Sequence, residues 1–325
     1  MRSALITGIC LALLGILSAS AFAQKIVIIS DINGSYGSTE YNFRVSNAVE
    51  EIIKLEPDLV ISAGDMVAGQ KQPLLDQEHL DRMWASFNRV VADPLAQAGI
   101  DFIVTPGNHD GSGFREFELE QKKFQAQWID RRPGLSLLEG SNWPRRYALL
   151  LGKVLIITID GTRPGRLQNA DLELLRDTLE REGGKAQSII VVSHLPIWPF
   201  AQGREKEIIN DPALPGLLSQ HGVDYFVSGH HHVYYPGVDD NGVVHLGVGP
   251  LGGNARRIVG RSGREPFSFA VLELCEQGNW ISSRKAPGFV EEIPLTSLPV
   301  SINGQLGSLI RIDLSEEYPA EACAR

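Results

Sequence analysis

Short apolar runs alternate along the chain with amphipathic segments, and most of the runs stop at a cluster of polar residues. In chain order the runs are KIVIIS, DLVISAG, IDFIVTPG, SIIVVS, VDYFVSG and VVHLGVG. They are rich in β-branched residues and mostly continuous in their apolar character. Runs of this kind are typical of strands that are buried on both faces, as between two layers of helices.

The segments between these runs carry the spacing of helices. In the first of them, apolar residues recur on one helical face, at Val45, Ala48, Val49, Ile52 and Ile53. Ser38 or Thr39 is predicted to cap this helix and Pro57 to end it. Residues 76–92 and 169–182 are also predicted helices. The strand–helix rhythm predicts an α/β fold with polar residues at the carboxyl ends of the strands, the edge at which open α/β sheets bind ligands.

The first 23 residues have the layout of a secretory signal peptide. Arg2 gives a positive start, residues 4–17 are apolar, and residues 21–23 (AFA) form a small-x-small cleavage site. The apolar stretch is short for a membrane span, and no other stretch is longer, so the mature chain is predicted to have no span. We therefore expect a mature chain that begins near Gln24 and is periplasmic or secreted.

The remainder is predicted to be one large domain over residues 24–285, followed by a C-terminal tail over residues 286–325 that packs on the same domain. In the tail the periodicity fades and three prolines interrupt it, although SLIRIDL is a candidate strand. Cys275 and Cys323 remain after processing. In an oxidising compartment they either form a disulfide that prevents fraying of the tail or stay as buried free thiols.

The balance of charge argues against one class of partner. The chain has 30 basic and 39 acidic residues, and the signal peptide contains one of the basic ones, which leaves 29 against 39. Proteins that bind nucleic acid stably usually neutralise its phosphates with a basic surface, so no stable nucleic-acid binding is expected. Nothing in the sequence predicts the oligomeric state.

Eight polar residues follow the apolar runs, and the predicted topology brings them to one edge of a sheet. They are Asp31, Asn33, Asp65, Asn108, His109, His194, His230 and His232. Each alone has an ordinary explanation, because Asp and Asn form turns and a single histidine is usually a hydrogen-bonded structural residue. Together they offer carboxylate, amide and imidazole donors for divalent metals, enough for two ions if one carboxylate bridges them.

These residues also fall into an ordered series of motifs. The motifs are Asp31-x-Asn33, Gly64-Asp65, Gly107-Asn108-His109-Asp110, Ser193-His194 and Gly229-His230-His231-His232. The series resembles that of the calcineurin-like metallophosphoesterases and extends from residue 25 to about residue 250. The resemblance implies a four-layer αββα sandwich with its metals at the carboxyl edge of the strands.

The resemblance implies a role for each motif residue. Asp31 and His232 would hold a first metal ion, and Asp65 would bridge it to a second. The other ligands of the second ion would be Asn108, His194 and His230. His109 would stand outside both shells and stabilise charge or protonate the leaving alkoxide after attack by a metal-bridging hydroxide.

The protein so implied is an exported, dinuclear metal-dependent phosphoesterase that hydrolyses small phosphate mono- or diesters. The alternative is a metal- or ligand-binding protein of the same fold that has lost catalysis. Asn33 raises this alternative, because the family usually has Asp-x-His where this chain has Asp-x-Asn.

Asn33 also bears on the choice of metal. If its amide oxygen ligates, the first site has three oxygens and one nitrogen, which favours Mn²⁺, Mg²⁺ or Fe²⁺ over Zn²⁺, with Mn²⁺ preferred. Otherwise Asn33 binds substrate, or the first ion is held by fewer protein groups.

Candidate substrate contacts lie beside the motifs. They are Ser35 and Tyr36, in a loop of small residues, and Arg163, after the run VLIITID; a tight turn and a surface arginine are the plainer explanations. Asp110 either orients a neighbouring group or is a solvated turn residue. Ala68 stands where purple acid phosphatases have a tyrosine ligand, and GNHD replaces the GNHE of protein Ser/Thr phosphatases, so neither subfamily is favoured.

Overall fold

The computed structural model describes residues 23–276, 278–316, 318 and 319. The predicted signal peptide lies outside the described residues apart from its last position, and so does Cys323. Cys275 is disulfide-bonded. Within the described ranges, no helix has both the length and the apolar character needed to cross a membrane.

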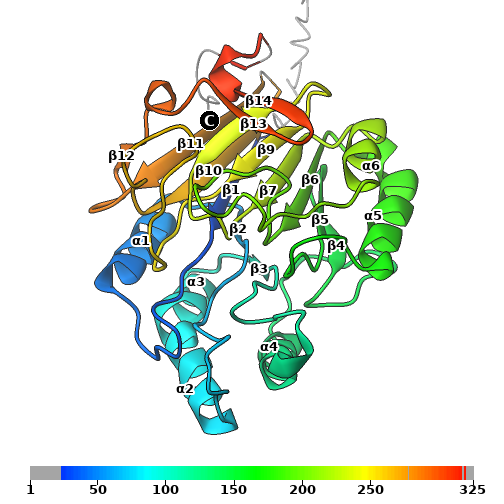
Figure 1. Ribbon diagram of the computed structural model, residues 1–325. Helices are drawn as coiled ribbons and strands as arrows, with labels where there is room; N and C mark the ends of the chain where they lie inside the picture. The colour runs from blue at the N-terminus through cyan, green and yellow to red at the C-terminus, as the bar shows by residue number, and fades with distance from the viewer. Residues whose placement is uncertain (1–22, 277, 317, 320–325) are drawn as a thin grey trace, which may run out of the picture.

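Two β-sheets form the centre of the protein (Figure 1). One contains β1 (Ala23–Ile29), β2 (Leu59–Ser62), β3 (Phe102–Val104), β10 (Ser268–Cys275), β11 (Gly278–Lys285) and β12 (Glu291–Glu292). The other contains β4 (Tyr147–Leu151), β5 (Val154–Thr158), β6 (Ser188–Ser193), β7 (Tyr225–Ser228), β8 (Tyr235–Val238), β9 (Val244–Gly247), β13 (Ser301–Gly304) and β14 (Gly307–Arg311). Their strand orders are β12-β11-β10-β1-β2-β3 and β13-β14-β8-β9-β7-β6-β5-β4.

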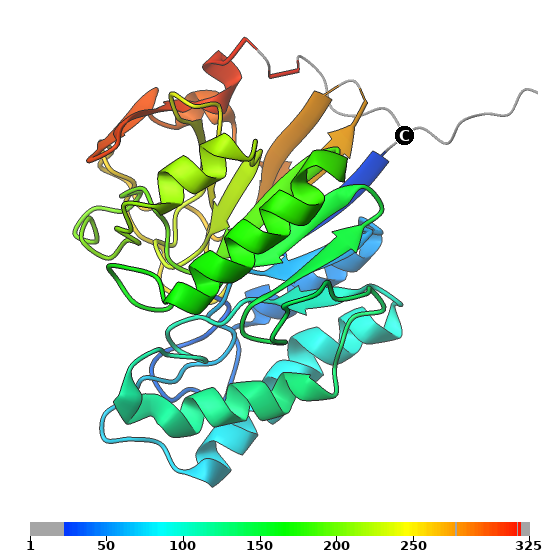
Figure 2. The ribbon, with the colours of Figure 1, turned by 90° about the vertical axis from the view of Figure 1, so that its right-hand side faces the viewer.

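Helices cover the outer face of each sheet. They are α1 (Phe43–Lys54), α2 (Gln77–Phe87), α3 (Asp93–Gln97), α4 (Glu118–Ile129), α5 (Asn169–Glu182) and α6 (Leu214–Gln220). Helices α1 to α3 lie on the side of the six-stranded sheet, and α5 and α6 lie over the eight-stranded sheet (Figure 2). The predicted αββα sandwich is confirmed, and the buried strands provide the continuous apolar runs of the sequence.

Parallel register brings the ends of the important strands to one edge. Ile29 of β1 pairs with Ser62 of β2, and Ser62 pairs with Val104 of β3. In the other sheet, Ser193 of β6 pairs with Ser228 of β7. Because each of these residues is at or near the end of its strand, the loops that follow meet at the same carboxyl edge.

The first helix begins later than its sequence signals suggest. Its N-cap is Asn42, whose side-chain oxygen accepts a hydrogen bond from the backbone nitrogen of Arg44 at 3.0 Å. The prediction that Ser38 or Thr39 caps this helix is therefore wrong. The Ser38 hydroxyl instead donates to the carbonyl of Glu40 at 2.9 Å, inside the preceding loop.

The other two predicted helices are present. Residues 76–92 contain α2 and a π-helical turn over Asn88–Ala92 that leads into α3, and Asp76 caps α2. Residues 169–182 coincide with α5.

The C-terminal segment adds strands to both sheets. Strand β12 pairs with β11 at the edge of the six-stranded sheet, and the hairpin of β13 and β14 joins the eight-stranded sheet beside β8. The segment SLIRIDL supplies most of β14. The Tyr318 ring stacks on that of Trp280, with centroids 5.4 Å apart. Most of residues 286–319 thus pack on the sandwich.

Replacing Asn42 by alanine should destabilise the protein, because the first turn of α1 loses its side-chain acceptor. We expect the free energy of unfolding to fall by about 1 kcal/mol, measured by urea unfolding. Thr39→Ala is the matched control and should change it by less than half as much. Equal effects of the two substitutions would contradict the cap assignment.

Candidate metal centre

Four of the seven predicted ligands lie on strained backbone at the carboxyl edge. Asp31, Asp65, His230 and His232 all have positive φ, at 49°, 57°, 60° and 52°. The left-handed region is unfavourable for residues with a side chain and costs of order 1 kcal/mol or more at each position. Such strain is typical of functional sites, where the surrounding structure fixes a conformation that the chain would otherwise avoid.

Asp31, Asp65 and His232 form the first of two buried ligand groups, with one donor atom of each within 4.8 Å of the others. His232 Nδ1 lies 2.6 Å from the carbonyl oxygen of Asn254 and must donate to it, since a carbonyl can only accept. In the neutral ring the lone pair is then on Nε2, which lies 2.9 Å from Asp31 Oδ1. Two lone pairs that face each other this closely need a cation or a proton between them.

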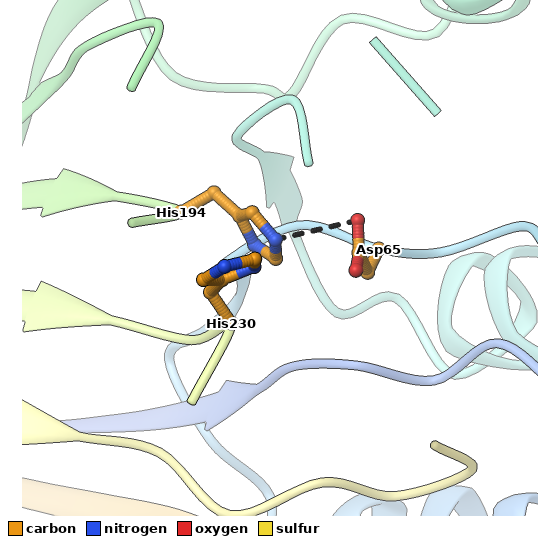
Figure 3. Close-up of side chains that lie close together, drawn as sticks. All are labelled: Asp65, His194 and His230. Atoms are coloured by element: carbon orange, nitrogen blue, oxygen red, sulfur yellow. Dashed lines mark ion pairs between the residues drawn. The ribbon is translucent and has the colours of Figure 1, made fainter. Parts of the chain in front are cut away.

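Asp65, His194 and His230 form the second group (Figure 3). His194 Nδ1 donates to the carbonyl of Ala63 at 2.8 Å, which directs the Nε2 lone pair into the site. That nitrogen lies 3.0 Å from Asn108 Oδ1 and 3.3 Å from Asp65 Oδ1, and both are acceptors. Burial lowers the pKa of His194, but the charges of nearby carboxylates, Asp65 foremost, outweigh it and raise the pKa to about 9, so Nε2 carries a proton at neutral pH unless a metal ion takes its place.

Asp65 belongs to both groups and is the natural bridge between them. Its Oδ1 accepts a hydrogen bond from the backbone nitrogen of His109 at 2.8 Å. Burial raises its pKa, but His194 and His109 more than compensate and hold the pKa of this carboxyl well below its usual range. Asp65 is therefore a carboxylate at neutral pH, able to face two cations at once.

The donor sets fit two divalent cations. In each group imidazole nitrogen and carboxylate oxygen converge from several loops, and hydrogen bonds from the far side of the ring orient His194 and His232. Asp31 Oδ1 is buried without a hydrogen-bond partner among the described residues. A buried acceptor opposite a lone pair is a suitable position for a cation.

The side-chain oxygen of Asn108 points toward a predicted ligand, whereas only the burial and the backbone contact of Asn33 place it beside the site. The amide nitrogen of Asn108 donates to Gln70 Oε1 at 2.8 Å, which turns its carbonyl oxygen toward His194. Asn33 is buried beside the site, where its backbone nitrogen donates to the carbonyl of Asp65 at 3.1 Å. Its role as a ligand remains a prediction.

Asp110 orients the loops of the site. It is buried and accepts hydrogen bonds from the backbone nitrogens of Met66 and Gly107, both at 2.6 Å. The solvated-turn alternative is therefore wrong. Burial and the charge of Asp65 raise its pKa to about 7. Gly107 is needed here, because a Cβ atom would lie only 2.1 Å from the backbone nitrogen of Asp65.

His109 stands beside the ligand groups and borders a cavity of ≈ 280 Å³. Its Nδ1 donates to the carbonyl of Gly69 at 2.9 Å, and its Nε2 lies 3.8 Å from Asp65 Oδ2. The Tyr36 ring packs 4.9 Å from the His109 ring, centroid to centroid. Besides these residues, the cavity lining includes Asn108, His230, His232, Gln70, Phe114, Thr162, Pro164, Leu195, Arg204, Glu207 and Arg256.

Three charged residues in this lining escaped the sequence analysis. Glu207 Oε2 lies 2.9 Å from His230 Nε2 and 2.6 Å from Arg204 Nη1, and Arg256 donates to the backbone carbonyl of His230. Burial lowers the pKa of His230 to about 4 even though Glu207 opposes the shift. Glu207 does not directly follow a strand or belong to a motif, so no pattern in the sequence identified it.

The candidate substrate residues separate in the structure. Tyr36 lines the cavity. Its neighbour Ser35 is exposed and is not part of the lining. Arg163 lines a neighbouring cavity instead. His231 is turned away from the ligands, since its Nδ1 accepts a hydrogen bond from the backbone of Phe200 at 3.0 Å.

Comparison with known proteins identifies the family. The family model described as calcineurin-like phosphoesterase matches residues 24–234, well over half of the chain. The protein belongs to this family. No curated protein matches the sequence.

Two solved structures illustrate the likeness of fold. A dimetal phosphatase from Danio rerio is 15% identical, with a TM-score of 0.60, over 83% of this chain and 98% of that one. A putative 5′-nucleotidase from Staphylococcus aureus is 15% identical, with a TM-score of 0.43, over 92% of this chain and 56% of that one. At 15% identity the first likeness is one of fold alone.

Removing the metals should destabilise the fold, because the facing lone pairs and the Asp65 charge lose their counter-ions. Chelation should lower Tm by about 5 °C or more, corresponding to roughly 2–3 kcal/mol. Two equivalents of divalent metal per chain should restore it, and elemental analysis should show this stoichiometry drop in Asp65→Asn. Asp239→Asn, which removes the carboxylate partner of His245 instead, is the control and should keep both ions.

Glu120 should make stability depend on pH. Burial raises its pKa to about 7, although both its oxygens accept from the backbone nitrogen of Gln70. Between the ordinary pKa of a glutamate and 7 the folded state keeps a proton that the unfolded state releases, so stability falls as pH rises through that window. Glu120→Gln should be more stable than wild type at pH 8, by about 1–3 kcal/mol in urea unfolding, and equal near pH 4. Glu118→Gln, exposed on the same helix, should show no such difference.

Proposed function

We propose that this protein is a dinuclear metal-dependent phosphoesterase that acts on small phosphate mono- or diesters. The observation that carries the proposal is the convergence of oriented lone pairs on two sides of the Asp65 carboxylate, with His109 just outside. Membership of the family agrees with this assignment. Asp31, Asn33 and His232 would hold one ion, Asn108, His194 and His230 the other, and Asp65 both.

Two ions held by these residues would supply an acidified water as nucleophile and neutralise charge on the phosphate oxygens. The residues of the chain orient the metal ligands and move a proton to the leaving group. Gly69 accepts from His109 Nδ1 and so fixes the ring, which leaves Nε2 at the cavity to stabilise charge or protonate the leaving oxygen. Glu207 would orient His230 through its Nε2, leaving Nδ1 for the ion.

We favour Mn²⁺ over Zn²⁺ for the first ion. With Asn33 as a ligand, oxygens of Asp31, Asn33 and Asp65 would surround it with one imidazole nitrogen from His232. This hard, oxygen-rich set suits Mn²⁺, Mg²⁺ or Fe²⁺.

We also propose that the protein works outside the cytoplasm, in a periplasm or as a secreted protein. The sequence of residues 1–23 supports this, and so does the disulfide at Cys275, because disulfides persist in oxidising compartments.

The test is hydrolysis of 4-nitrophenyl phosphate and its bis-ester by chain 24–325, stripped with chelator and reloaded in turn with Mn²⁺, Mg²⁺, Fe²⁺ or Zn²⁺. Activity should return with metal, best with Mn²⁺. His109→Ala should lower kcat by about 10²–10⁴-fold while two ions remain bound, since it removes only the proton donor. His221→Ala, a histidine away from the cavity, should keep full activity.

One outcome would favour the alternative. A folded wild-type chain that binds two ions but turns over neither ester, with any metal, would support a binding protein that has lost catalysis. The bis-ester and mono-ester rates, compared in an active protein, choose between diesterase and monoesterase action.

A further inference from the structure

A second cavity, of ≈ 470 Å³, lies beside the first and is lined almost wholly by polar side chains. Its lining is Gly113, Gln121, Arg145, Arg146, Arg163 and Gln168. Three arginines in one cavity are notable in a chain whose net charge is −9. Overall basicity cannot explain them.

Buried carboxylates hold two of the arginines in place. Arg145 Nε donates to Asp160 Oδ2 at 2.9 Å, and Arg146 Nε donates to Asp171 Oδ1 at 3.0 Å. Both carboxylates are fully buried, while the arginine side chains remain 17% and 15% exposed. The buried carboxylates therefore fix two planar guanidinium groups at the wall of the cavity, with further N–H donors at its surface.

Arg163 adds a third cation to the lining of this cavity. It is exposed, its guanidinium carbon lies 5.5 Å from the centre of the Phe114 ring, and its Nη1 donates to the carbonyl of Gly113 at 3.3 Å. Across the described residues, no carboxylate pairs with it. Three guanidinium groups over two buried carboxylates leave the cavity with a net positive charge.

The two cavities share a wall. Phe114, Thr162 and Pro164 line the metal cavity, whereas their neighbours Gly113 and Arg163 line the arginine cavity. A Cβ atom on Gly113 would lie 3.0 Å from atoms of both Thr162 and Arg163, so the two segments are in close contact. The two cavities are therefore adjacent.

We propose that the arginine cavity binds a second anionic group of the substrate, a phosphate or a carboxylate, while the scissile phosphate lies at the metals. This inference rests on the proposed function and narrows its substrates to phosphate esters with two anionic groups. Guanidinium groups match the paired oxygens of such anions with charge-assisted hydrogen bonds. Arg163 is thereby a specificity residue at the far end of the substrate.

Pentyl phosphate and pentane-1,5-diol bisphosphate are a matched pair of test substrates, since they differ only in the second phosphate. Release of inorganic phosphate by the metal-loaded protein should show a kcat/KM about tenfold or more higher for the bisphosphate, well above the twofold that its two equivalent esters allow. Arg163→Gln should abolish the preference by raising KM for the bisphosphate and leave pentyl phosphate unchanged. Arg163→Lys should restore part of it.

Arg166→Gln is the control, because Arg166 is an exposed arginine of the same loop that lines neither cavity. It should keep the full preference. No preference beyond twofold in the wild type, or equal losses in Arg163→Gln and Arg166→Gln, would overturn the proposal.

A binding measurement separates failure of this proposal from failure of the proposed function. Inorganic phosphate is titrated calorimetrically into the chelated protein, where the carboxylates of the metal site repel it. Suppose that neither ester is hydrolysed. Phosphate binding by the wild type that is lost in Arg163→Gln would still support the anion site, and no phosphate binding by the wild type would overturn it. Binding of free phosphate without any preference for the bisphosphate would show that the cavity takes an independent anion, and would overturn the link to the substrate.

Discussion

The carboxylate of Asp65 is the one group that both ligand clusters share, and the arrangement around it depends on its staying charged while buried. Its own loop has a left-handed backbone, and the backbone nitrogen of His109 and the ring of His194 face its oxygens. Asp110, beneath it, ties the loop of β2 to the loop of β3. A buried carboxylate is stable only with such compensation, so the loops of both sheets must close around it together.

This arrangement has a cost in stability that the rest of the protein offsets. Four left-handed residues, buried charges and facing lone pairs concentrate at one edge, while most of the buried residues in the central strands behind it are apolar. The packing of the central strands between two helical layers holds the loops of the site in this strained arrangement. The same geometry requires glycine at two motif positions, because neither Gly64 nor Gly107 has space for a Cβ atom.

The fold class and the position of the candidate metal centre could be predicted from the sequence, because the patterns that indicate them are local and recur along the chain. Buried strands are continuous apolar runs, and the residues that follow them fall at one edge once the strands are parallel. The cap of α1 was mispredicted because Ser38, Thr39 and Asn42 are all good caps, and only the path of the loop selects among them. Glu207 and the arginine cavity arise from segments brought together by the fold, and no spacing in the chain records them.

The first strand of the sandwich has a partner from the far end of the chain. Ala23 of β1 pairs with Cys275 of β10, so the six-stranded sheet cannot close until nearly the whole sequence is available. Contacts between residues so distant in sequence make folding slow. The metal ligands are affected in the same way, because Asp31 follows β1 and His230 and His232 follow β7, so the candidate metal centre cannot assemble before both sheets have formed.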